Sequence, residues 1–250
     1  MLKIPVLTTL LVAFIAASTP AQQVSPSDHS EADIGQQSAD LAAEDEPGER
    51  PDFGDYKLRR GAKEYAVEFG MAPMQPTFLS GRKEYDTAGR KFAMASFQFG
   101  RVIGTTKGVT FEYMFEVIPI SFAIKNEVKN PDYISEKETP DTPKTVRTNT
   151  FSIGVQPAAF RFVFMPRRRL KPYVRLGAGF IFSSKPIPVP DSPSYNFAAD
   201  FGGGLMYHLS RKRTINFGYR YFHISNMNIG EINPGYNANV FYVGYSFFSK

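Results

Sequence analysis

Near its C-terminus the chain reads Ile215-Asn216-Phe217-Gly218-Tyr219-Arg220-Tyr221-Phe222-His223-Ile224-Ser225-Asn226. Apolar residues occupy every second position from 215 to 221, which is the period of a β-strand with one apolar face. His223 and Ser225 continue that apolar face. A histidine and a serine among aromatic neighbours indicate a role beyond packing.

The same alternation recurs along the chain from about residue 60 onward. The expected strands cover residues 64–71, 93–100, 109–117, 150–165, 173–182, 196–208, 215–226 and 237–248. Each sets large apolar side chains on one face against Glu, Gln, Asp, Arg or Gly on the other. In the fourth run the alternation changes phase near Gln156-Pro157, which indicates a β-bulge. The pattern therefore predicts an all-β fold of eight antiparallel strands.

Two architectures fit such strands. In a soluble up-and-down barrel or sandwich the apolar face points inward, whereas in an outer-membrane barrel it points to lipid and polar side chains fill the interior. The second is favoured because the connections alternate between short (104–108, 166–169, 210–213) and long (72–90, 125–147, 184–194, 226–237). Short turns belong on the periplasmic side of such barrels. We expect an eight-stranded antiparallel transmembrane β-barrel of the outer-membrane type.

The N-terminal part of the chain differs from the rest. Residues 1–21 predict a signal peptide, with Lys3, an apolar stretch and a small-residue cleavage site at Thr19-Pro20-Ala21. Residues 22–55 hold ten of the 24 acidic residues and almost no aromatics, so we expect a disordered acidic tail. Residues 56–250 are then the barrel. No apolar run of 18 residues follows residue 20, which excludes a helical membrane protein.

Charge and cysteine content narrow the function. Residues 56–250 carry 27 Lys and Arg against 14 Asp and Glu, so the barrel is basic. For an exported chain an anionic membrane surface is a better partner than nucleic acid. The chain has no cysteine, which rules out disulfides, a lipid anchor on cysteine and a thiol nucleophile. No cluster with metal-ligand spacing appears, and we expect neither a metal nor a cofactor.

The direction of the strands places a polar cluster, made of His223, Ser225 and Asn237, in the membrane. With the N-terminus in the periplasm, the strand at 215–226 runs outward, so His223 and Ser225 lie at the outer leaflet. Asn237 opens the next strand at the same height and shares the outward parity of Phe241. We expect His223, Ser225 and Asn237 to meet on the lipid-facing wall, where polar groups are costly unless they act on something. In a Gram-negative cell that leaflet is lipopolysaccharide.

The motif His223-x-Ser225-Asn226, followed by Asn233-x-Gly235 and an aromatic-rich last strand, resembles the signature of the lipid A 3-O-deacylase family, also called PagL-type. The resemblance implies a serine esterase that hydrolyses the acyl chain at the 3-position of lipid A. It implies Ser225 as nucleophile and His223 as general base. Asn226 and Asn233, with nearby backbone N–H groups, would stabilise the oxyanion.

The sequence departs from the family pattern at one position. The family's best-known pattern has a glutamate four residues after the second asparagine, where this chain has Asn237. An amide oxygen still orients the imidazole but does not stabilise the imidazolium by charge. Glu231 is the alternative residue for orienting the imidazole. A further alternative is that the site is inactive.

A non-catalytic alternative also stays open, because serine and asparagine at a strand end are common turn formers. In it the chain is a small structural or adhesive barrel that acts through its long second loop. Assembly as a homodimer is compatible with either function. For the enzyme, we expect cations around the first loop to attract lipid A phosphates, namely Arg82, Lys83, Arg90 and Lys91.

Overall fold

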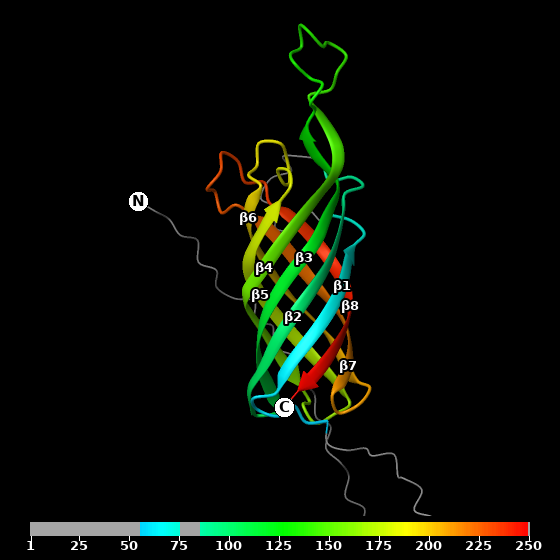
Figure 1. Cartoon of the computed structure of the whole chain (residues 1–250), viewed down its shortest axis with the longest axis vertical. Coiled ribbons are helices and arrows are strands. Elements are labelled where there is room, and N and C mark those ends of the chain that lie inside the picture. The colour runs from blue at the N-terminus through cyan, green and yellow to red at the C-terminus, as the bar shows by residue number, and fades with distance from the viewer. Residues whose placement is uncertain (1–55, 76–85, 250) are drawn as a thin grey trace, which may run out of the picture. The chain divides into compact units, whose positions relative to one another are not determined.

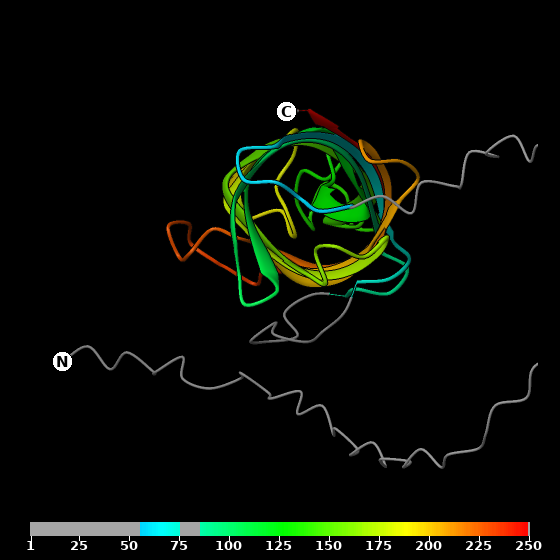
Figure 2. The same cartoon turned by 90° about the horizontal axis from the view of Figure 1, so that it is seen from below.

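The computed structural model describes residues 56–75 and 86–249. Within them the chain forms a closed barrel in which each strand pairs antiparallel with its neighbours in sequence and β1 pairs with β8 (Figure 1). The strands are β1 Lys63–Ala72, β2 Lys91–Thr106, β3 Val109–Lys129, β4 Thr145–Phe164, β5 Leu170–Ser183, β6 Tyr195–His208, β7 Arg213–Ser225 and β8 Tyr236–Ser249. The predicted eight-stranded antiparallel barrel is confirmed. Figure 2 shows the same barrel from below, where the strands form a closed ring.

Some expectations lie outside the described residues. These are the signal peptide at 1–21, the acidic tail at 22–55, and the loop cations Arg82 and Lys83. In the part of the chain that the structure describes, no helix is long and apolar enough to cross a membrane.

The outward face of the barrel is apolar. Phe97, Phe201 and Phe217 are 56%, 47% and 53% exposed, although they come from three different strands. A soluble barrel would pack these rings together inside, so that alternative is wrong. An apolar band around a closed barrel is stable in the hydrocarbon of a bilayer, since closure leaves no unpaired strand edge.

Charged side chains fill the interior. Arg175 donates to Glu116 and Asp200, both at 3.1 Å, and Arg220 donates to Glu116 at 2.9 Å. Arg161 pairs in the same way with Glu64 and Glu112. All of these side chains are buried, and a buried charge is tolerated only when it is paired and hydrogen-bonded. The polar faces of the strands therefore form a packed core.

The predicted bulge in β4 is present. The β4–β5 register slips between Val155 and Ala158, so that one extra residue on β4 bends the strand. Gly179 lies against this bulge, where a Cβ atom would overlap the carbonyl oxygen of Val155. The glycine run in β6 has a similar cause, because a Cβ at Gly202 would overlap the carbonyl oxygen of Tyr219.

Two expectations about the loops are wrong. The second long loop was expected at 125–147, but β3 and β4 continue to Lys129 and from Thr145, which leaves 130–144 as the connection. Residues 126–129 of β3 pair with residues 145–148 of β4, and this hairpin extends beyond the ends of the other strands (Figure 1). Arg90 was expected to face lipid headgroups. It is fully buried instead and donates to the Pro188 carbonyl at 2.6 Å and to Glu127 at 3.2 Å, so it ties the β5–β6 connection to β3.

Candidate active site

The polar cluster lies where β7 ends and β8 begins, at the end of the barrel that carries the long connections. His223 stands directly opposite Asn237 in the β7–β8 ladder. Gly235 turns the chain into β8 with a positive φ of 69°, which favours glycine. A Cβ atom at Gly235 would lie 3.1 Å from Cε1 of His223. The glycine of the Asn-x-Gly motif therefore makes room for the imidazole.

The imidazole of His223 is held from one side. Its Nδ1 donates to Oδ1 of Asn237 at 2.5 Å. The side chain of Asn237 is fully buried, which fixes the acceptor. Because Nδ1 carries the hydrogen in this bond, the lone pair is on Nε2. Among residues 56–75 and 86–249, Nε2 of His223 has no hydrogen-bond partner, so it is open to a substrate.

Ser225 is bonded to the loop that follows it. Its Oγ donates to Oδ1 of Asn233 at 3.1 Å and accepts from Nδ2 of Asn233 at 2.9 Å. The backbone N–H of Met227 also donates to this Oγ, at 3.1 Å. Two hydrogen-bond donors therefore surround the hydroxyl. The N–H of Met227 is a group that no sequence motif singles out, because a backbone donor is placed by the turn alone.

Asn226 is placed differently from Asn233. Its Nδ2 donates to the carbonyl of Ile232 at 2.7 Å, and its Oδ1 accepts from the N–H of Asn228 at 2.8 Å. The side chain is buried, and both of its ends are used to fold the loop. Asn226 therefore builds the loop, while its own N–H donates to Asn233 at 3.1 Å.

His223 and Ser225 share one face but do not touch. Residues two apart on a strand are separated by roughly 7 Å along the chain. In the described chain no hydrogen bond joins the two side chains, and Oγ of Ser225 is hydrogen-bonded to Asn233 instead. Catalytic hydrogen bonds of this kind often form only with substrate bound. Glu231 is exposed in the loop and makes no hydrogen bond to His223.

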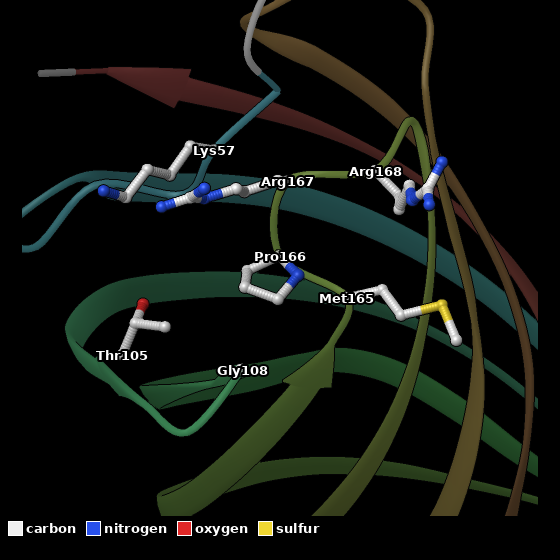
Figure 3. A pocket seen from close by; sticks show the side chains of 7 residues that line it. All are labelled: Lys57, Thr105, Gly108, Met165, Pro166, Arg167 and Arg168. Carbon is white, nitrogen blue, oxygen red and sulfur yellow. The ribbon is translucent and has the colours of Figure 1, made fainter. Parts of the chain in front are cut away.

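Among the hollows on the described part of the chain, two lie at opposite ends of the barrel. A groove of ≈ 400 Å³ on the outer wall reaches His223 and is bordered by Leu176, Ala199, Phe201 and Tyr221. The other lies at the end with the short turns, where Lys57 and Arg167 from separate segments extend to the same side (Figure 3). Its lining has no histidine and no carboxylate. Of these two hollows, the groove on the outer wall is therefore the one that contains a residue of the predicted site, His223.

The fold and the site together define a class: an outer-membrane β-barrel of the Gram-negative type with a Ser/His/Asn cluster on its lipid-facing wall. The family model described as lipid A 3-O-deacylase (PagL) matches residues 133–246. This confirms the resemblance seen in the motif. The match runs from the β3–β4 connection into β8 and includes every residue of the cluster.

Several solved structures are similar to the chain. The outer membrane enzyme PagL is 13% identical, with 74% of this chain and 98% of that chain covered and a TM-score of 0.43. Neisserial surface protein A is 15% identical, with 75% and 99% covered and a TM-score of 0.44. Ail, the attachment invasion locus protein of Yersinia pestis, is 11% identical, with 76% and 100% covered and a TM-score of 0.38. No curated protein sequence matches the chain significantly.

Proposed function

We propose that this barrel is a serine esterase that hydrolyses the 3-O-linked acyl chain of lipid A in the outer leaflet. The observation that carries the proposal is the His223–Asn237 hydrogen bond of 2.5 Å, which leaves Nε2 free on the lipid-facing wall beside Ser225. The match to the lipid A 3-O-deacylase family over residues 133–246 supports the substrate class.

The first chemical step is acyl transfer to the enzyme. Nε2 of His223 takes the proton of the Ser225 hydroxyl as Oγ attacks the ester carbonyl. The oxyanion that forms lies two bonds from Oγ, so Nδ2 of Asn233 and the N–H of Met227 are close enough to donate to it. The tetrahedral intermediate collapses, the C–O bond to the sugar breaks, and the imidazolium gives its proton to the departing sugar oxygen.

The second step releases the fatty acid. Water attacks the acyl-serine while His223 takes one of its protons. The second tetrahedral intermediate then collapses, the bond from the acyl carbon to Ser225 Oγ breaks, and the imidazolium of His223 returns the proton to Oγ. Asn237 keeps the imidazole in the productive tautomer through both steps. Because Asn237 is fully buried in the barrel wall, a neutral amide avoids the desolvation that a carboxylate would suffer there. The amide offers less stabilisation to the imidazolium in return.

Fatty acid release from lipopolysaccharide tests the proposal. Purified full-length barrel should release a 3-linked acyl chain that is detected by mass spectrometry, and Ser225→Ala should abolish the release. Ser194→Ala is the matched control, because Ser194 is exposed in the connection before β6. Release that continues unchanged in Ser225→Ala would refute the serine mechanism.

The β3–β4 hairpin favours a second candidate, a structural or adhesive barrel. Its connection at 130–144 is exposed over much of its length and is held by a Lys144–Glu136 ion pair of 2.5 Å (Figure 1). Shortening this connection should then remove attachment to a surface, while Ser225→Ala should leave attachment unchanged. The enzyme hypothesis expects the reverse for acyl release.

A further inference from the structure

The excess positive charge of the barrel lies at the end with the short turns. The strand ends and turns there, residues 56–63, 101–111, 162–172 and 205–215, hold thirteen Lys and Arg and no Asp or Glu. At the other end, residues 86–91, 125–148, 184–194 and 226–237 hold eight Lys and Arg and eight Asp and Glu. The charge that predicted an anionic membrane partner is therefore concentrated at the far end from the candidate active site.

Three of these cations lie on the outward face of the barrel wall. Lys63 and Arg101 stand directly opposite each other on β1 and β2, and Arg213 opens β7. All three residues are exposed. Lys63 and Arg101 share the outward face of Tyr65 and Phe99, which lie two residues away on each strand. We call Lys63, Arg101 and Arg213 the basic collar.

The basic collar lies at the height of the inner leaflet. Arg213 and His223 are ten residues apart on β7, and the outward positions between them carry only isoleucine, phenylalanine and tyrosine. Ten residues of a strand tilted by about 40° span roughly 25 Å along the membrane normal, which is the height of the apolar band of such barrels. Since short turns lie on the periplasmic side, Arg213 is level with the phospholipid headgroups of the inner leaflet.

The basic collar has no counter-charge in the described part of the barrel. Residues directly opposite each other on neighbouring strands have Cβ atoms roughly 5 Å apart, and like charges in such a pair destabilise the sheet. Over residues 56–75 and 86–249, the side chains of Lys63, Arg101 and Arg213 form no hydrogen bond and no ion pair. An anion from outside the barrel would offset this repulsion.

Aromatic rings cover the wall beside the basic collar. Phe247 stands opposite Arg213 in the β7–β8 ladder and opposite Tyr65 in the β1–β8 ladder. Tyr65 in turn packs edge-on against Phe99, with ring centroids 5.4 Å apart. All three rings are exposed. Aromatic side chains at headgroup height, with an apolar wall above them, suit the glycerol and acyl parts of a lipid, which a soluble anion lacks.

We propose that the basic collar binds an anionic phospholipid of the inner leaflet, with its phosphate between Lys63 and Arg101 and its acyl chains along Tyr65 and Phe99. A zwitterionic headgroup fits less well, because its ammonium group would lie against the cations. The inference is independent of the proposed function, since the basic collar and the candidate active site lie in opposite leaflets.

Lipid retention by the purified full-length barrel tests this inference. The barrel in detergent is mixed with equal amounts of phosphatidylglycerol and phosphatidylethanolamine that carry the same acyl chains, and native mass spectrometry counts the lipids that stay bound. Wild type should retain more phosphatidylglycerol, and Lys63→Gln with Arg101→Gln should lower this preference on the order of tenfold. Lys107→Gln with Arg168→Gln is the matched control, because it removes the same charge from exposed turn residues at the same end.

Each outcome decides the inference. Equal retention of the two lipids by wild type would overturn it. Equal loss of preference in both double variants would also overturn it, because a general attraction between charges then explains the binding without a site on the wall. Arg213→Gln gives a second readout and should lower the preference about threefold. Inorganic polyphosphate is finally added to wild type. Displacement of the bound lipid would assign the basic collar to a soluble polyanion and contradict the inference, whereas continued retention supports it.

Discussion

Asn237 faces His223 directly across the β7–β8 ladder and accepts a hydrogen bond from its Nδ1 at 2.5 Å. The register that closes the barrel also sets this pair, so orientation of the imidazole depends on strand pairing and not on a mobile loop. Glu231, the acidic residue nearest in sequence, is exposed and makes no such contact.

Asn237→Ala should lower kcat by about 10²-fold, because the imidazole loses the group that fixes its tautomer. Asn237→Glu should keep or raise kcat by adding charge next to the imidazolium, while the buried carboxylate lowers the thermal unfolding temperature. Both are measured on one lipid A preparation. Equal activity of Asn237→Ala and wild type would remove Asn237 from the mechanism and leave a Ser-His dyad.

Glu231→Gln should change turnover by less than about twofold, since an exposed side chain without contact to the site contributes little. The same lipid A assay measures it beside Asn237→Ala. A large loss in Glu231→Gln with a silent Asn237→Ala would reverse the assignment of the orienting residue.

Asn233→Ala should lower kcat by about 10²- to 10³-fold with little effect on KM, because it removes one donor to the oxyanion. Asn226→Ala should instead loosen the loop, since both ends of its amide are bonded there. Limited proteolysis of the 226–235 connection distinguishes them. Faster cleavage in Asn233→Ala, equal to that in Asn226→Ala, would show a structural role for both.

Gly235→Ala should reduce activity strongly while the barrel stays folded. The substitution places a Cβ 3.1 Å from the His223 ring at a φ of 69°, a backbone conformation that costs about 1–3 kcal/mol for other residues. Gly108→Ala is the matched control, because Gly108 has a φ of 79° but no atom near its Cβ position. If both variants lose the same activity, backbone strain alone is the cause.

Arg90→Ala should lower the free energy of unfolding by about 1–3 kcal/mol, because the Pro188 carbonyl and Glu127 lose their buried donor. Chemical denaturation of the refolded barrel measures it. Lys91→Gln, which changes an exposed cation beside it, should raise KM for lipid A and leave stability unchanged. A raised KM in Arg90→Ala without loss of stability would restore Arg90 as a headgroup contact.

The sequence by itself determined the strands, their two faces and the β4 bulge. Alternation with a period of two is local in sequence, so the outward faces of the segments around Phe97 and Phe201 can be assigned without knowing which strands they pair with. It also placed His223 and Ser225 on the outward face. The sequence did not predict that β3 and β4 extend to residues 126–129 and 145–148. These two segments pair with each other and have no continuous apolar face that would mark them as strands.

Only the tertiary structure decided what depends on register. It buried Arg90 between the outer end of β3 and the β5–β6 connection, used Asn226 to build the β7–β8 connection, and placed Ala158, Ala178 and Ala199 in one row with His223. Neighbours in this row are 20 or more positions apart in the chain, and their alignment is set by hydrogen bonds between strands and by the bulge in β4. Periodicity within one strand carries no information about the offset between strands, so closure of the barrel had to supply it.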